Sequence, residues 1–281
     1  MRIRPLRLAL LLGTLAAATL AVPASPAFAS LSLYRQSNTS VSDDSSPKTV
    51  TVSCGTDDVV GMGGHINGSN DVVMSKMFVD TGLRTVTVQG IESTAVTTAW
   101  SVDAYAVCAP AGSVTGLNLQ QHTSTSDPYY KSGITATCTG SNKVFGGGYK
   151  LELAAGKAAM DELNFSSSLG SVSSTAYVHD PTVGNFTLTT QAICGTPATT
   201  MSLQTWTSAS NSISPKIETT QTCPGTTQPS GTGAVLTGLV GSGSVAGLEP
   251  HLSNQAAEVT GRELGFSGNG WLIQAQAICI G

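Results

Sequence analysis

Six cysteines at near-constant spacing are the feature that most constrains this chain. They fall into three pairs separated by 54, 56 and 56 positions, and the pairs recur every 84 to 86 residues. A large aromatic residue stands eight positions before the second cysteine of each pair. A period this regular is typical of an architecture built from stacked or symmetry-related units. The predicted disulfides are Cys54–Cys108, Cys138–Cys194 and Cys223–Cys279, and the three aromatics are Trp100, Phe186 and Trp271.

The N-terminal segment 1–29 has the three-part layout of a secretory signal peptide. Three arginines precede an apolar run over 8–22, and an A-x-A cleavage pattern ends at Ala29. The run is shorter than the roughly 20 apolar residues that a membrane-spanning helix needs. We therefore expect a mature chain, 30–281, that is secreted and extracellular and has no membrane span.

Charge and cysteine usage exclude several classes of partner. The whole chain has a formal net charge of −4, and removal of 1–29, with three arginines and no acid, makes it −7. So few Lys and Arg residues give no electrostatic footprint for nucleic acid or an anionic membrane. Evenly paired cysteines in an exported chain indicate disulfides rather than a metal or redox site. We predict no cofactor.

Three repeats account for the whole mature chain with almost nothing left over. We place them at about 30–115, 116–199 and 200–281, which is about 84 residues each. Units this small build thin cores and commonly depend on disulfides, so a core shared by all three would bury more apolar surface. We predict one three-repeat domain with pseudo-threefold symmetry. The alternative is three small disulfide-closed β-sandwich units in tandem.

The hydrophobic pattern within each repeat is that of β-strands. Counting back from Cys108 in steps of two passes Ala106, Ala104, Val102 and Trp100, and the other copies follow the same order of residue types. Alternation of this kind gives a strand with one buried face. We therefore expect the three aromatics in the core. Each repeat is predicted to have four or five short strands, one of them beginning at a glycine-rich cluster: Met62-Gly63-Gly64, Gly146-Gly147-Gly148 or Gly231-Thr232-Gly233.

With export, an all-β pattern, three internal repeats and glycine clusters soon after a cysteine, the chain resembles in layout the vitelline membrane outer layer protein I family. The resemblance implies a β-prism, in which three four-stranded sheets pack around a pseudo-threefold axis. It also implies a link to extracellular coats and carbohydrate. The family's cysteine pattern and local motifs do not match residue by residue, so the resemblance assigns no functional residue.

Tests for catalytic and metal chemistry identify no site. The histidines at 65, 122, 179 and 251 are scattered and lack a zinc-type spacing. Glycoside hydrolysis needs two carboxylates across a cleft, whereas the acid pairs at 43–44, 57–58 and 161–162 are adjacent residues in polar segments. Calcium binding by Asp57, Asp58 and Asp71 is a milder possibility without the EF-hand spacing. We predict no catalytic and no metal-binding residues.

Exposed aromatics are the best candidates for ligand contact, because their rings can stack on sugars. None of the candidates keeps an aromatic at the equivalent position of the other repeats, so three identical sites are not expected. The candidates are Tyr34, Tyr105, Tyr129, Tyr130 and Trp206.

The leading functional hypothesis is a secreted, non-catalytic protein that binds an extracellular glycan or forms part of a coat. Whether the chain is an enzyme stays open, with a non-catalytic role favoured. The enzyme alternative is a glycan-cleaving protein whose acids assemble across repeats. A further alternative is an inhibitor or toxin-like module that binds a protein.

Overall fold

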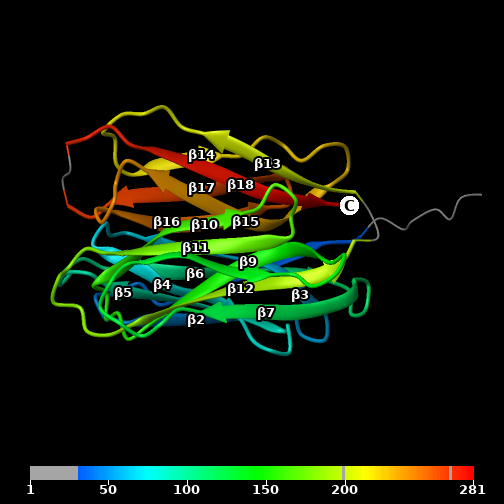
Figure 1. Cartoon of the computed structure of the whole chain (residues 1–281), viewed down its shortest axis with the longest axis horizontal. Helices are drawn as coiled ribbons and strands as arrows, with labels where there is room; N and C mark the ends of the chain where they lie inside the picture. The colour runs from blue at the N-terminus through cyan, green and yellow to red at the C-terminus, as the bar shows by residue number, and fades with distance from the viewer. Residues whose placement is uncertain (1–30, 198–199, 266–267) are drawn as a thin grey trace, which may run out of the picture.

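The computed structural model describes residues 31–197, 200–265 and 268–281, and in them it contains 18 β-strands and no helix. The all-β prediction is confirmed. Three six-stranded sheets surround a common interior and give an elongated prism (Figure 1). The predicted signal peptide, 1–29, lies outside the described residues. Within the described ranges there is no helix of the length and apolarity needed to cross a membrane.

Each repeat supplies six strands, β1–β6, β7–β12 and β13–β18, rather than the four or five expected. All strand pairs are antiparallel. The first sheet has the order β1 (Tyr34–Thr39), β6 (Ser101–Ala109), β3 (Asp58–Asn67), β16 (Gly243–His251), β17 (Ala256–Glu263), β14 (Lys216–Thr219). The second has the order β13 (Met201–Thr207), β18 (Leu272–Ile280), β15 (Gln228–Thr237), β10 (Ala158–Phe165), β11 (Ser171–Val178), β8 (Lys131–Thr137). The third has the order β2 (Lys48–Ser53), β5 (Thr85–Glu92), β4 (Val72–Val79), β9 (Lys143–Glu152), β12 (Thr187–Thr196), β7 (Thr115–Thr123).

Every sheet is shared between two repeats. The third strand of each repeat pairs with the fourth strand of another, as β3 with β16, β9 with β4, and β15 with β10. This exchange closes a ring, because each repeat gives one half-sheet to each neighbour. The alternative of three separate β-sandwich units in tandem is therefore wrong. The sheets also have six strands, whereas the family resemblance implies four.

Glycines explain how three strands from different repeats meet at the centre. Gly61, Gly146 and Gly231 recur every 85 residues and lie at a bulge in β3, β9 and β15. A Cβ on Gly61 would lie 1.6 Å from the backbone oxygen of Ser230, and one on Gly146 would lie 2.8 Å from the Cα of Gly61. No side chain fits where backbones approach this closely. The glycine clusters thus lie inside strands rather than at their beginnings.

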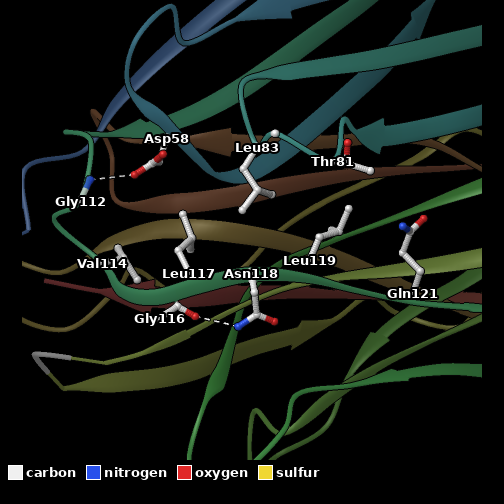
Figure 2. Close-up of a pocket in the computed structure, with 11 residues that line it drawn as sticks. Asp58, Thr81, Leu83, Gly112, Val114, Gly116, Leu117, Asn118, Leu119 and Gln121 are labelled. Atoms are coloured by element: carbon white, nitrogen blue, oxygen red, sulfur yellow. Dashed lines mark hydrogen bonds between the residues drawn. The ribbon is translucent and has the colours of Figure 1, made fainter.

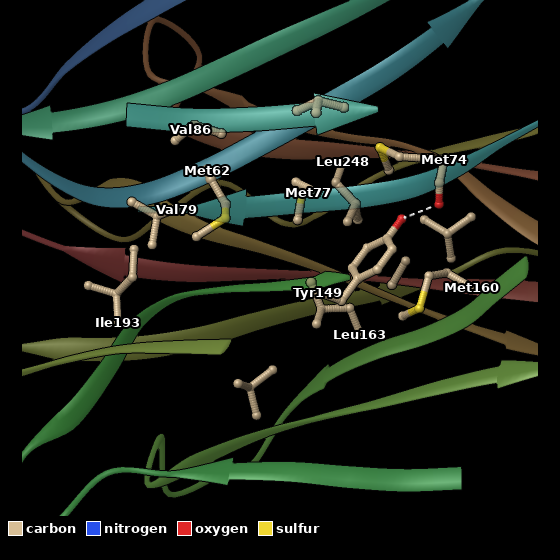
Figure 3. Packing of buried hydrophobic residues seen from close by; sticks show 14 of the residues in the cluster. Met62, Met74, Met77, Val79, Val86, Tyr149, Met160, Leu163, Ile193 and Leu248 are labelled. Carbon is tan, nitrogen blue, oxygen red and sulfur yellow. Dashed lines mark hydrogen bonds between the residues drawn. The ribbon is translucent and has the colours of Figure 1, made fainter. Parts of the chain in front are cut away.

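One hydrophobic core runs through all three repeats. The buried cluster includes Met62 and Met77 from the first repeat, Tyr149 and Leu163 from the second and Leu248 from the third. Figure 3 shows these side chains converging, with the hydroxyl of Tyr149 donating to the backbone oxygen of Met74 at 2.9 Å. The buried hydroxyl therefore has the partner that burial requires. Sharing the core gives each thin repeat the apolar burial that it lacks alone.

The disulfides and the predicted aromatics mark the two ends of the prism. All three disulfides pair as the cysteine spacing predicts, with Cα–Cα distances of 5.5 to 5.7 Å. Each closing strand, β6, β12 or β18, begins next to its aromatic and carries its cysteine near its end. The C-terminus, just after Cys279, lies at the disulfide end (Figure 1).

Candidate functional site

A buried lysine lies on the ring of each predicted core aromatic. Trp100, Phe186 and Trp271 are at most 1% exposed, as expected for core residues. The lysine nitrogens lie 4.7 to 4.8 Å from the ring centroids, a cation–π distance. The three pairs are Lys48 with Trp100, Lys131 with Phe186, and Lys216 with Trp271. These pairs, here called the lysine–aromatic sites, were not anticipated from the sequence, although the lysines recur at intervals of 83 and 85 residues.

Each of these lysines also donates to an Asp or Asn a few residues before it. The partners are Asp43 for Lys48, Asp127 for Lys131 and Asn211 for Lys216. The lysine lowers the pKa of Asp43 well below its usual range and that of Asp127 to about 2. Two of the buried cations are therefore neutralised by a carboxylate, as burial of a charge requires. These contacts lie at the aromatic end of the prism, opposite the disulfides.

The second repeat departs from the other two next to its lysine, and the departure creates a pocket. A proline directly precedes Lys48 and Lys216, whereas Tyr129 and Tyr130 precede Lys131. Both tyrosines point outward, with 72% and 60% of their surface exposed. Tyr130 stacks on Tyr177 of β11 with ring centroids 5.6 Å apart and an interplanar angle of 24°.

The tyrosines line an open pocket of about 780 Å³, here called the tyrosine pocket. Two prolines and Ser132 extend the wall, and Val240 and Gly241 of the third repeat form the opposite side. None of the described residues that line it carries a charge. The site therefore offers flat aromatic faces and phenolic hydroxyls rather than an ionic contact. Two of the five predicted ligand residues, Tyr129 and Tyr130, come together here.

A second hollow, of about 610 Å³, lies along β7 towards the disulfide end of the prism (Figure 2). Figure 2 shows Leu83, Leu117 and Leu119 pointing towards one another across it. Its acid, Asp58, is already engaged, because it pairs with Arg84 at 3.1 Å and accepts from the backbone nitrogen of Gly112 at 2.9 Å. This hollow has no exposed aromatic ring and lacks the stacking surface of the tyrosine pocket.

Tyr105 is not available as a ligand contact, because it belongs to a buried polar cluster between the first and third repeats. It is 8% exposed and donates to Asp103 at 3.2 Å. Beside it, Glu249 of β16 pairs with His65 of β3, with 2.6 Å between carboxylate oxygen and Nδ1. Burial opposes the charge of Glu249, but hydrogen bonds from His65 and Tyr105 outweigh it and lower its pKa.

In this cluster acids from two repeats, Asp103 and Glu249, lie around Tyr105, an arrangement of the kind that the enzyme alternative requires. Glycosidases need one carboxyl group with a raised pKa to act as the acid. Glu249 shows the opposite shift, and its carboxylate is held 2.6 Å from Nδ1 of His65. The geometry is that of an interlocking contact between repeats.

The other candidate residues lie apart from the tyrosine pocket. Tyr34 is half-buried and donates to Asp57 at 2.7 Å. Trp206 is exposed on the edge strand β13. The suggested calcium ligands do not meet, because Asp57 and Asp58 lie at one end of β3 and Asp71 follows the other end.

One acid of the predicted pairs has an unusual environment. Asp161 is buried at a bulge of β10, and burial, with a smaller contribution from Glu162, raises its pKa to about 7. The equivalent bulge residue in β4, Ser75, donates to the backbone oxygen of Gln89 at 3.3 Å. A protonated Asp161 suits the same environment, and nothing places it in a cleft.

No protein-family model matches the chain, and no curated protein is significantly similar to it in sequence.

Proposed function

We propose that the protein is a secreted, non-catalytic glycan-binding protein of the extracellular space, with the tyrosine pocket as its contact site. The observation that carries the proposal is the exposure of Tyr129 and Tyr130 at an open, uncharged pocket. Contiguous exposed apolar patches mark interaction sites more often than scattered single residues do. Three disulfides fit an oxidising, extracellular setting.

The chemistry of the pocket favours an uncharged sugar. The apolar face of a pyranose stacks on a tyrosine ring, and phenolic hydroxyls both donate and accept hydrogen bonds. Tyr130 is held against Tyr177, so its orientation is set before a ligand arrives. Such preorganisation lowers the entropic cost of binding. The family resemblance in layout, with its link to carbohydrate and coats, points the same way.

The test is binding of the purified mature chain to a glycan array, followed by calorimetry with the best ligand. We expect Tyr129→Ala and Tyr130→Ala each to weaken binding about tenfold, which corresponds to about 1.4 kcal/mol. Trp206→Ala is the matched control, because it removes an exposed aromatic from another edge of the prism and should leave affinity unchanged.

Other outcomes identify the alternatives. Release of sugar products from cell-wall or chitin polymers would contradict a non-catalytic role and support the glycan-cleaving enzyme. Co-purification with one secreted protein, without glycan binding, would support the inhibitor or toxin-like module. Equal loss of affinity in Trp206→Ala would place the contact elsewhere on the surface.

A further inference from the structure

The third lysine–aromatic site differs chemically from the other two. In the first and second repeats the buried lysine faces a carboxylate, Asp43 or Asp127. In the third repeat Lys216, equally buried, faces the carboxamide of Asn211. An aspartate and an asparagine differ in reactivity, because an ionised carboxylate resists attack by an amine and a carboxamide carbon does not carry that charge.

The surroundings of Lys216 favour a nucleophilic amine. Its side chain is buried and packs on the face of Trp271, with the nitrogen 4.8 Å from the ring centroid. Burial lowers the pKa of the Lys216 ammonium, and the charges of Glu218 and Glu263 partly oppose that shift. A buried lysine with a depressed pKa is a typical nucleophile.

Contact geometry brings the reacting groups together. Nζ of Lys216 donates to Oδ1 of Asn211, one bond away from the carboxamide carbon. It also donates to the backbone oxygen of Ala209 at 3.3 Å, a hydrogen bond that an amide nitrogen retains. Asn211 is fixed in turn by backbone hydrogen bonds in both directions with Trp271. Reactants held in this way need little further ordering.

We propose that Lys216 and Asn211 form an intramolecular isopeptide bond in the folded protein. The unprotonated Lys216 nitrogen attacks the carboxamide carbon of Asn211 and a C–N bond forms. The bond from that carbon to Nδ2 breaks, and nitrogen leaves as ammonia. One proton lost by Nζ is transferred to the departing nitrogen, so that the nitrogen leaves as a neutral ammonia molecule. The balance is one amine and one carboxamide giving one secondary amide and one ammonia, with no oxidant or reductant.

The same chemistry is not expected at the other two sites. Asp43 and Asp127 both have a depressed pKa, so they face their lysines as carboxylates. The molecule thus contains two internal controls for one reactive site.

The decisive measurement is the intact mass of the purified mature chain after reduction and unfolding. We expect a mass lower than that of the sequence by one ammonia. Lys216→Arg should restore the full mass, and Lys48→Arg should keep the deficit. A wild-type chain with its full mass would overturn the proposal, and this result needs no variant to fold.

Peptide mapping separates the isopeptide bond from a succinimide at Asn211, which also loses one ammonia. A trypsin digest should cut after Lys48 and Lys131 but not after Lys216, because an amidated lysine is not a substrate. Cleavage after Lys216 in the peptide that carries the deficit would overturn the cross-link.

Discussion

The three repeats have identical residues at the axis of the prism but different residues at the lysine–aromatic sites. At the axis, glycine occupies the equivalent positions 61, 146 and 231 in all three repeats. At the lysine–aromatic sites, one aromatic is Phe186 rather than Trp and one partner is Asn211 rather than Asp. Backbone meets backbone at the axis, whereas at the lysine–aromatic sites the differing residues meet through their side chains, beside contacts to backbone oxygens. Symmetry is therefore strict where no atom can be added, and variable where one side chain can adjust to another.

Where two repeats meet, a residue that differs from its equivalents contacts a partner that differs as well. Gln191 and Gln276 each accept from a backbone nitrogen of the neighbouring repeat, that of Val79 at 3.0 Å and that of Phe165 at 2.8 Å. The third equivalent of this strand position is Pro250, which has no N–H to donate. There the glutamine is replaced by Tyr105, and Arg35 donates to the Pro250 oxygen at 3.0 Å. Each seam between repeats keeps a side-chain contact, but not the same one.

Gly61→Ala should have the largest effect and is the direct test of the axis. Its Cβ would overlap the backbone oxygen of Ser230, an atom that cannot move without breaking the ring of strands. We expect a loss of more than about 4 kcal/mol, a large fraction of the about 5–15 kcal/mol by which a typical domain is stable. The matched control is Gly184→Ala, whose Cβ meets nothing within 4 Å. Circular dichroism and thermal unfolding of both variants test this, and a Gly61→Ala protein that unfolds at the wild-type temperature would refute the account of the axis.

Trp271→Ala should come next, because it empties a fully buried site at the opposite end from the disulfides. Truncation of a buried tryptophan costs about 3–5 kcal/mol, whereas an exposed stacking residue should leave stability within about 0.5 kcal/mol. Chemical denaturation followed by fluorescence or circular dichroism distinguishes these values. Unfolding at the wild-type midpoint together with loss of glycan binding would show that the ring contacts ligand and not the core.

Much of the architecture could be predicted from the sequence, because it depends on periodic signals. The cysteine spacing predicts all three disulfides, and strand parity predicts the burial of Trp100, Phe186 and Trp271. The exchange of half-sheets could not be predicted, because pairing of β3 with β16 depends on which edges meet in space. The role of Gly61 could not be predicted for the same reason. A glycine in a strand pattern indicates a bulge, and only the structure shows that the backbone oxygen of Ser230 lies against Gly61.

The candidate site was less accessible to sequence reasoning. Tyr129 and Tyr130 are predicted ligand contacts because their rings can stack on sugars, and the structure adds Tyr177 and Val240 from distant segments. Tyr105 was selected on the same grounds, but a cross-repeat contact with Glu249 buries it. The three lysines carry a usable signal in their near-regular spacing, but the spacing alone does not indicate that each lysine packs on an aromatic ring.

Asp161 offers a smaller effect at a third variable position, the bulge of the fourth strand, where the repeats carry Ser75, Asp161 and Ala246. Its pKa of about 7 in the folded protein exceeds its value of 3.8 in an unfolded chain, so the folded state binds the extra proton between these values. Stability is therefore fully present at low pH and falls as pH rises from about 4 to about 7. The shift corresponds to at most about 4 kcal/mol, and partial solvent access should reduce this to about 2 kcal/mol.

Asp161→Ser, which introduces the residue of the first repeat, should be more stable than the wild type at pH 8 and differ little at pH 4. Urea unfolding at both values measures the difference, and comparison with the wild type cancels other groups such as His179, whose lowered pKa acts in the opposite direction. Asp127, with a pKa of about 2, titrates below this range. A pH-independent difference between the two proteins would mean that Asp161 is ionised throughout.

The last prediction tests whether the size of the aromatic ring at a lysine–aromatic site is matched to the residue paired with the lysine. Phe186 occupies the position of Trp100 and Trp271. Gly90 and Gly261 pair with Lys48 and Lys216, and a Cβ on them would lie 2.8 and 3.2 Å from Cζ3 of Trp100 and Trp271. In the second repeat the residue paired with Lys131 is Ala176, and the aromatic is the smaller Phe186.

The larger ring thus stands beside glycine and the smaller ring beside alanine, so Phe186→Trp alone should overpack the site and cost about 1–3 kcal/mol. Adding Ala176→Gly should recover about 1–2 kcal/mol of that loss, although Ala176→Gly alone is destabilising, and a double-mutant cycle measures this coupling. The indole nitrogen of Trp100 donates to Glu92 at 3.1 Å, whereas that of Trp271 is buried without a partner among the described residues. Additive effects of the two substitutions would mean that the pairing of ring size with glycine is coincidental, and that the second repeat tolerates either ring independently of its neighbour.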